Sequence, residues 1–165
     1  FLYYGDEIGM RYQKLPTKEG CYFRTGSRTP MQWAPGKNLG FSDAAPEDLY
    51  LPVDPAPDAP TVAGQQADPN SLWHTVKALL AFRHAHRDLD SDAPFKVLFA
   101  PKAKGDYRPF AWRRGALVCA VNPAGAQAEV PLKLEEGTRV LFAIGQATVR
   151  DGTLVLGAQS FAILG

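Results

Sequence analysis

The sequence is poor in the features that mark several protein classes. It has only two cysteines, Cys21 and Cys119, which lie far apart and form no CxxC spacing. Neither a disulfide framework nor a zinc knuckle is therefore indicated, and we expect two reduced thiols in a cytoplasmic protein. No apolar run approaches the roughly 18 residues that a membrane span needs. The sequence likewise gives no reason to expect a signal peptide.

An excess of charge of either sign is missing as well. The 18 Lys and Arg residues nearly balance the 17 Asp and Glu residues, which leaves a formal net charge of +1. This balance gives no electrostatic reason to expect nucleic acid or a membrane as a partner. There is no Gly-rich phosphate loop and no GxSxG elbow. His84 and His86 do not share a helix face and His74 lies over two turns away, so we predict no metal and no cofactor.

The chain is also too short for one large fold class. Its 165 residues are too few for a complete TIM barrel, which takes about 250 residues. The sequence starts at Phe1, without Met, inside an apolar run. We therefore expect a piece of a longer protein.

The first half combines one short apolar run with a long irregular stretch. Phe1–Tyr4, stopped by Gly5, is expected to be a strand covered on both faces, as in a parallel sheet. Residues 11–67 lack sustained periodicity, which is uncommon in a compact domain unless the stretch is functional or disordered. Residues 11–37 are mainly basic, whereas residues 38–70 carry acids and no Lys or Arg. The two halves either attract each other or are solvated surface loops.

A helix and then a series of strands are expected to follow. Asp68 as N-cap, Pro69 at the first position and apolar residues at helical spacing predict a helix over 69–87. Asp151-Gly152 predicts a two-residue hairpin turn. From Phe95 onward, short β-rich runs separated by turn residues predict an antiparallel β-sandwich of eight strands. The expected strands are 95–99, 107–112, 116–121, 128–132, 139–143, 147–150, 154–156 and 160–164.

Two places combine side chains suited to chemistry. Asp6 and Glu7 follow the expected first strand, where α/β folds place active sites, although their spacing alone favours a role as acceptors of loop hydrogen bonds. Residues 28–33, Arg-Thr-Pro-Met-Gln-Trp, bring a guanidinium, an amide and an indole within six positions. Sugar sites combine such groups, and an ordinary loop with a structural tryptophan is the alternative.

These two segments resemble the alpha-amylase family of glycoside hydrolases. Residues 1–10 resemble the family's last barrel strand. Residues 28–33 followed by Gly40-Phe41-Ser42 resemble the loop of its α-glucosidase, oligo-1,6-glucosidase and trehalose synthase branch. The pattern continues through Leu51-Pro52-Val53 and residues 65–71 to the helix ending in Ala81-Phe82-Arg83. The β-rich module is similar to the family's C-terminal domain by position and strand pattern.

The resemblance implies an α+β fragment. Residues 1–90 would be the last βα unit of a TIM (β/α)8 barrel with its long loop, and residues 91–165 a β-sandwich domain. It also implies a retaining mechanism with two carboxylates and a further supporting Asp. All three lie upstream in the family, so no catalytic residue is expected in this chain.

The resemblance further implies a set of substrate-binding residues. Arg28 matches an arginine that holds hydroxyls of the non-reducing-end glucose, and Gln32 belongs to the same motif. Tyr4, Asp6 and Glu7 match the strand end beneath the pocket. The implied partners are an α-linked gluco-oligosaccharide and the missing N-terminal barrel portion. Hydrolysis and transglycosylation share this loop, and the sandwich either binds sugar or supports the barrel, so these alternatives stay open.

Overall fold

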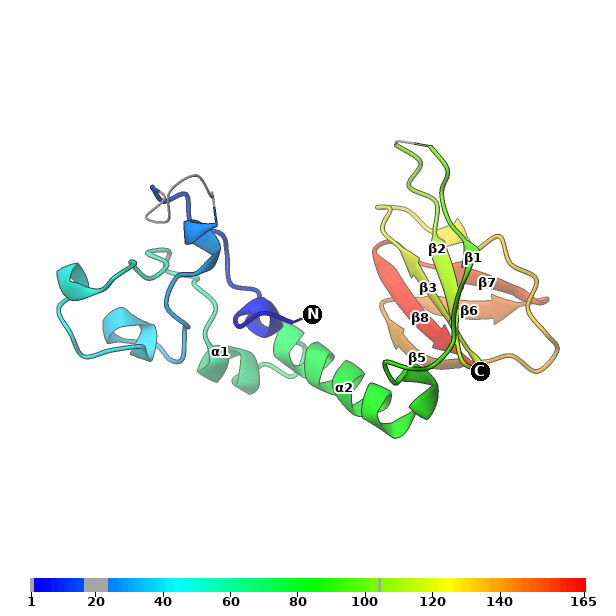
Figure 1. Ribbon diagram of the computed structural model, residues 1–165, viewed down its shortest axis with the longest axis horizontal. Helices are drawn as coiled ribbons and strands as arrows, with labels where there is room; N and C mark the ends of the chain where they lie inside the picture. The colour runs from blue at the N-terminus through cyan, green and yellow to red at the C-terminus, as the bar shows by residue number, and fades with distance from the viewer. Residues whose placement is uncertain (1, 17–23, 104) are drawn as a thin grey trace. The chain divides into compact units, whose positions relative to one another are not determined.

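The computed structural model describes residues 2–16, 24–103 and 105–165 (Figure 1). The chain divides into two compact units, Phe1–Leu79 and Leu80–Gly165. It is an α+β chain whose sheets are antiparallel. The domain boundary expected after residue 90 stays a prediction.

The first unit is built from short turns of helix joined by irregular chain. Its described elements are the 3-10 helices Asp6–Ile8, Thr25–Ser27, Lys37–Gly40 and Pro46–Asp48, followed by α1 (Val62–Ala67). Its buried apolar side chains are few, namely Ile8, Met31 and Leu51. Most of its other buried side chains are polar: Thr25, Thr29, Gln32, Asn38, Asp54, Thr61 and Ser71. Hydrogen bonds and ion pairs, more than apolar packing, therefore hold the segments of this unit together.

The strand expected at the start of the chain does not form in its described part, residues 2–4. Tyr3 instead closes a turn on Asp6: the Asp6 backbone N–H donates to the Tyr3 carbonyl at 3.1 Å, and the Tyr3 N–H donates to the Asp6 carboxylate at 2.9 Å. A strand needs a hydrogen-bonded neighbour, and these groups are used locally. Phe1 lies outside the described residues. The barrel unit expected for residues 1–90 is thus not confirmed.

The helix expected over 69–87 is α2 (Leu72–Ala85), which begins three residues later than predicted. Asp68 does not cap it. The Asp68 carboxylate accepts from the Asn70 N–H at 2.9 Å and forms a local turn that ends α1. Ser71 takes the capping position, because its hydroxyl oxygen accepts from the His74 N–H at 3.4 Å. No residue of α2 is buried.

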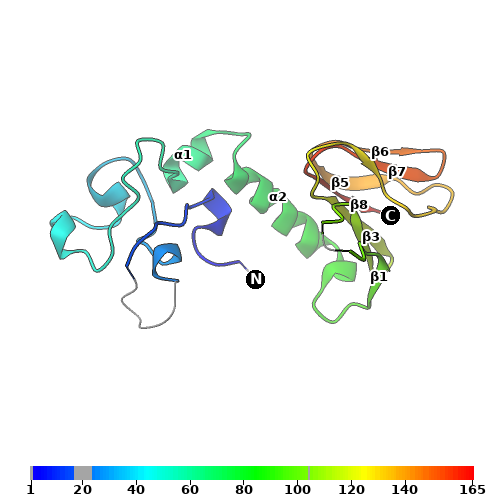
Figure 2. The same cartoon turned by 90° about the horizontal axis from the view of Figure 1, so that it is seen from above.

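The second unit contains the predicted eight strands. They are β1 (Phe95–Phe99), β2 (Phe110–Arg114), β3 (Leu117–Asn122), β4 (Ala128–Glu129), β5 (Val140–Ile144), β6 (Ala147–Arg150), β7 (Thr153–Leu156) and β8 (Ser160–Leu164). Three of them, β1, β6 and β8, have the predicted bounds, and the others begin or end a few residues away. A five-stranded sheet has the order β1-β2-β3-β8-β5, and a three-stranded sheet the order β4-β7-β6. Figure 2 shows β6 and β7 in one layer above β5 and β8.

The core of the sandwich lies between these sheets. It holds Ala111, Val118, Ala120, Ala162 and Leu164 from the larger sheet, Leu154 and Leu156 from the smaller one, and Val130, which follows β4. The predicted Asp151-Gly152 turn is confirmed, since both residues have positive φ (49° and 74°) and Arg150 pairs with Thr153.

The aromatic residues of the larger sheet lie on both of its faces. Phe99 packs against the core. Trp112, in contrast, is in register with Cys119, one position from the core pair Ala111 and Ala120, and so faces the opposite side of the sheet. There its ring stacks with Phe161 at 6.1 Å and Phe110 at 5.2 Å between centroids. The alternation of a strand therefore gives this sheet a second apolar face.

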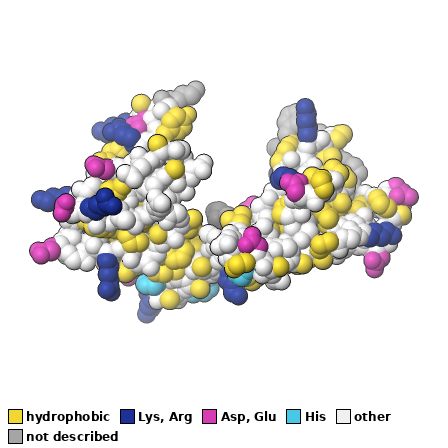
Figure 3. Space-filling view, turned by 180° about the vertical axis from the view of Figure 1, so that it is seen from behind, with side chains coloured by type: hydrophobic (Ala, Val, Ile, Leu, Met, Phe, Trp, Pro, Cys, Tyr) yellow, Lys and Arg dark blue, Asp and Glu magenta, His cyan; other side chains and the backbone are white. Residues whose placement is uncertain are grey.

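The surface is mixed in charge. On the face drawn in Figure 3, Lys and Arg side chains are interspersed with Asp and Glu side chains, as the net charge of +1 predicts. Among the described residues, no helix combines the length and the apolar character that a bilayer span requires.

Candidate functional site

The first unit contains a cavity of about 480 Å³. Its walls come from segments that are far apart in the sequence, and four of its lining side chains are exposed aromatic rings. The lining residues are Tyr4, Glu7, Arg28, Pro30, Met31, Trp33, Phe41, Tyr50 and Leu51. One cation and one carboxylate thus lie in a largely apolar and aromatic hollow.

Glu7 and Tyr4, which we call the floor of this cavity, are each held by a hydrogen bond. Gly5 has a φ of 91°, which lets its N–H donate to the Glu7 carboxylate at 2.8 Å. The Tyr4 hydroxyl donates to the Thr29 carbonyl at 3.0 Å. Partial burial raises the pKa of Tyr4 above its usual value, and the charge of Arg28 acts in the opposite direction. Tyr4 is therefore a neutral hydroxyl at ordinary pH and ties the floor to the segment that carries Arg28.

The segment of residues 28–33 forms one wall. Thr29 and Gln32 are each 1% exposed. The Gln32 side-chain amide donates to the Pro60 carbonyl, and its backbone carbonyl accepts from the Val62 N–H at 2.9 Å. Thr29 and Gln32 are thus buried within the wall, whereas Arg28 and Trp33 line the cavity.

A turn of left-handed residues positions Phe41 beside Trp33. Asn38 and Leu39 have φ values of 50° and 52°, and the Asn38 amide donates to the carbonyls of Ser42 and Ala44 at 2.8 and 2.9 Å. The Trp33 N–H donates to the Leu39 carbonyl at 2.8 Å. Asparagine tolerates this conformation better than most residues, which explains its presence at the turn.

The five predicted binding residues lie in three places. Tyr4, Glu7 and Arg28 line the cavity. Asp6 lines a smaller hollow of about 160 Å³ together with Tyr12. Gln32 is buried in the wall rather than exposed to the cavity. The assignment of all five to a substrate remains a prediction.

Tyr50 is 66% exposed and lines the cavity, although its sequence context did not indicate a site residue. Its signal was a lone aromatic residue in an acidic, proline-rich stretch. Phe41, which belongs to the Gly40-Phe41-Ser42 motif, also lines the cavity. Tyr22, Phe23 and Cys21 lie outside the described residues.

The attraction proposed between the basic and acidic halves of the loop is present. Arg11 forms ion pairs with Asp54 and Asp58 at 2.9 and 3.0 Å. The Lys37 ammonium donates to the Asp43 carbonyl at 2.7 Å. These contacts join residues 11–37 to residues 38–70 within the same unit as the cavity.

Comparison with known proteins identifies the family. A family profile described as "Alpha amylase, catalytic domain" matches residues 1–92, more than half of the 165 residues. The chain belongs to the alpha-amylase family. The matched residues include every residue that lines the cavity.

Relatives within the alpha-amylase family differ in what they do. The trehalose synthase/amylase TreS of Mycobacterium tuberculosis (strain ATCC 25618 / H37Rv) is 34% identical over 119 residues, covering 64% of this chain and 19% of that protein. The alpha-glucosidase of Pediococcus pentosaceus is 38% identical over 84 residues, covering 51% of this chain and 14% of that protein. The chain thus spans less than a fifth of the length of these two relatives.

A solved structure supports the fold. The trehalulose synthase MutB from Pseudomonas mesoacidophila MX-45 superposes with a TM-score of 0.69 at 22% identity. The match covers 86% of this chain and 25% of that protein. The fold of this chain is therefore that of the corresponding part of an alpha-amylase-family protein.

Proposed function

We propose that this chain is the C-terminal part of a retaining alpha-amylase-family enzyme that acts on the α-glucosidic bonds of malto- or isomalto-oligosaccharides. The observation that carries the proposal is the cavity of about 480 Å³ that combines Arg28 and Glu7 with exposed aromatic rings. This cavity lies wholly within the segment that matches the family's catalytic domain.

The side chains of the cavity suit a glucosyl ring. A guanidinium presents a planar fork of donors that can bind two vicinal hydroxyls at once. The Glu7 carboxylate supplies acceptors for hydroxyl protons. The flat faces of Trp33, Phe41 and Tyr50 offer apolar surface for the C–H side of a pyranose. These residues bind and orient the sugar.

The bond-breaking groups belong to another part of the protein in this proposal. A retaining glycosidase needs two carboxyl groups about 5–5.5 Å apart, one as nucleophile and one as acid and then base. Glu7 is the one carboxylate among the described lining residues. It cannot fill both roles, so the catalytic carboxylates are assigned to the portion that the relatives have in addition.

The exposure of α2 supports the presence of a further barrel portion. Its apolar residues Leu72 and Leu80 are 43% and 37% exposed. An amphipathic helix usually buries its apolar stripe. The barrel portion would cover these side chains, and the sandwich would support that barrel.

Isomerisation by glucosyl transfer is the second candidate. It is favoured by the 34% identity to a trehalose synthase/amylase over 119 residues. Both activities share the covalent glycosyl-enzyme step. They differ in whether water or a sugar hydroxyl attacks that intermediate.

The test uses the intact protein that contains this chain, incubated with maltose and with isomaltose. Proton NMR of the first products is expected to show α-glucose, as retention requires, and the appearance of trehalose would identify the isomerase. Failure of the intact protein to bind or convert any α-linked gluco-oligosaccharide would reject the proposal. The isolated 165-residue chain is expected not to turn over p-nitrophenyl α-glucoside.

A further inference from the structure

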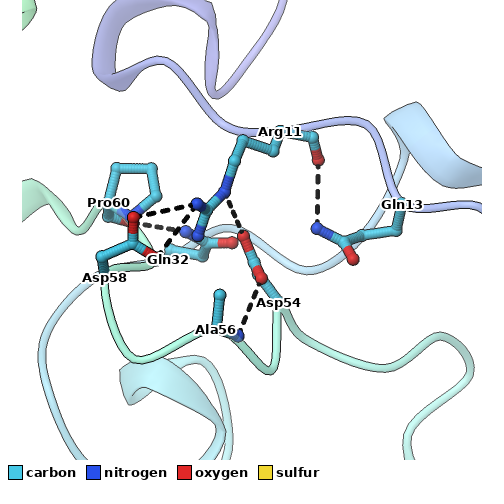
Figure 4. Close-up of polar contacts among 7 residues, drawn as sticks. All are labelled: Arg11, Gln13, Gln32, Asp54, Ala56, Asp58 and Pro60. Atoms are coloured by element: carbon cyan, nitrogen blue, oxygen red, sulfur yellow. Dashed lines mark hydrogen bonds and ion pairs between the residues drawn. The ribbon is translucent and has the colours of Figure 1, made fainter.

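Arg11 connects two distant parts of the first unit. Its Nε donates to Oδ2 of Asp54 at 2.9 Å, and its Nη1 donates to both carboxylate oxygens of Asp58 at 3.0 and 3.2 Å (Figure 4). The three residues come from segments more than 40 positions apart in the sequence. One guanidinium thus joins the chain after the cavity floor to the proline-rich stretch.

The two acids differ sharply in their surroundings. The side chain of Asp54 is 3% exposed, whereas that of Asp58 is 77% exposed. The second oxygen of Asp54 accepts from the Ala56 N–H at 3.0 Å. Both oxygens of a buried carboxylate are therefore used, and removal of either bond leaves a buried polar group unpaired. The bond to Asp58 is an exposed pair of the kind that contributes little.

Asp54 lies just after the residues that form one side of the cavity. Tyr50 and Leu51 line the cavity, and only Pro52 and Val53 separate Leu51 from Asp54. The same stretch is fixed farther along by the Gln32 amide, which donates to the Pro60 carbonyl. Prolines restrict the backbone between these points, so the position of Asp54 is transmitted to Leu51.

We propose that Arg11, acting through Asp54, is a positioning residue that holds Tyr50 and Leu51 opposite Trp33 and so sets the affinity of the cavity for the sugar. The effect on affinity rests on the proposed function. Arg11 and Asp54 touch neither substrate nor the reacting atoms in this scheme. Arg11 and Asp54 act on the width of the cavity indirectly, through the positions of Tyr50 and Leu51.

Asp54→Asn in the intact protein is the sharpest variant. An amide of the same shape offers one acceptor, so it cannot accept from both the Arg11 Nε–H and the Ala56 N–H. We expect KM for maltose to rise about tenfold, equivalent to about 1.4 kcal/mol, with kcat within about twofold. Asp48→Asn, an exposed acid of the same stretch that lies outside the cavity lining, removes the same charge and is expected to leave KM unchanged.

A double-mutant cycle separates positioning from general loosening. In a Tyr50→Ala background the cavity has already lost the Tyr50 ring that Asp54 is proposed to position. We therefore expect Asp54→Asn to have little further effect on KM. Arg11→Lys keeps the charge and loses the fork, and we expect it to raise KM in the same direction without loss of folded protein. Independent, additive effects of Asp54→Asn and Tyr50→Ala on KM, or an equal fall of kcat in the single variants, would overturn the proposal.

Hydrogen exchange without any sugar keeps this inference separate from the proposed function. We expect the amides of residues 50–58, including Ala56, to exchange faster in Asp54→Asn than in Asp48→Asn. Unchanged exchange in Asp54→Asn would overturn the inference, whatever the activity. If the wild-type protein turned over no α-glucoside, the proposed function would fail. Faster exchange in Asp54→Asn would still show that Arg11 and Asp54 hold residues 50–58 in place.

Discussion

The carboxylate of Asp88 accepts a hydrogen bond from the backbone N–H of Ala116, with 2.7 Å between Oδ1 and the nitrogen. Asp88 lies in the 3-10 helix Arg87–Leu89, and Ala116 lies in the turn between β2 and β3. The contact leaves no room beside the turn, because a Cβ added at Gly115 would lie 1.9 Å from the same oxygen. Gly115 also has a φ of 51°.

We expect Asp88→Ala to lower the free energy of unfolding by about 1–2 kcal/mol, since it removes a charge-assisted bond to a backbone N–H. Gly115→Ala should cost more, because it adds a clash to an unfavourable backbone conformation. Thermal unfolding of the protein measures both changes, and Asp92→Ala, an exposed acid nearby, is the control. Equal stability of Asp88→Ala and the control would contradict the prediction.

Asn122 is expected to be the most sensitive polar residue of the sandwich. It is fully buried, its amide donates to the carbonyls of Gly157 and Ala126 at 2.6 and 2.8 Å, and its oxygen accepts from the Ala124 N–H at 3.1 Å. Asn122→Ala leaves these backbone groups unpaired, which should cost about 3 kcal/mol. Urea unfolding checks this value.

Two further variants sharpen that test. Asn122→Asp should be at least as harmful above pH 6, because a carboxylate would face two carbonyl oxygens, and it should recover in part when acid protonates the carboxyl group. Gln127→Ala, on an exposed side chain of the same region, should change stability by less than about 0.5 kcal/mol. A large effect of Gln127→Ala would show that the whole loop, rather than Asn122, is sensitive.

Arg28 is expected to contribute to transition-state binding in the intact enzyme. Arg28→Ala should lower kcat/KM by an amount equivalent to about 1–3 kcal/mol, as for a lost charged hydrogen bond. Arg28→Lys should fall between, because lysine keeps the charge and loses the fork. Steady-state kinetics with maltose measures these changes. Arg24→Ala makes the same change of charge at a residue that does not line the cavity, and similar kinetics for Arg24→Ala and Arg28→Ala would argue against a contact with substrate.

Cys119 is expected to be an unreactive thiol. Burial raises the pKa of Cys119 to about 11, while the charge of Arg114 acts in the opposite direction. In a Cys21→Ser background, iodoacetamide at pH 8 should therefore label the native protein at least about a hundredfold more slowly than the unfolded protein. Rapid labelling of the native protein at pH 8 would contradict the prediction.

The same pKa gives stability a definite dependence on pH. Because the folded pKa lies above the ordinary value of 9.0, the contribution is complete below pH 9 and is lost as pH rises toward 11. Other groups titrate in this range, so the measurement is the difference in stability between Cys119→Ala and the wild type at each pH. That difference should shift in favour of Cys119→Ala between pH 9 and 11.

Local sequence signals were enough for most of the sandwich. Asp151-Gly152 specifies its turn by backbone conformation alone, and β6 accordingly has the predicted bounds. The start of α2 was missed because Asp68 and Ser71 are both good capping residues. The choice depends on Gln65, whose carbonyl accepts from the Ser71 hydroxyl at 2.6 Å, and α1, which carries Gln65, had not been predicted.

The candidate site was predictable only where a single segment determines it. The motif around Arg28 showed a donor suited to sugars, and the structure places Arg28 at the cavity. The same motif made Gln32 look equivalent. Its partner, the Pro60 carbonyl, lies 28 positions later, so no local pattern could show that its amide is used in the wall. The strand predicted at the start of the chain was wrong for Leu2–Tyr4 for another reason. An apolar run forms a strand only where other strands pair with it, and the run itself does not show whether such strands are present.

The place of β8 in the larger sheet has a consequence for synthesis. It is the last of the described strands along the chain, yet it lies between β3 and β5. Until β8 emerges from the ribosome, β3 presents an unpaired edge composed almost entirely of apolar residues. The sheet therefore closes only after all the other described strands have been made, and in that interval a chaperone or a neighbouring nascent chain can compete with β8 for the same backbone groups.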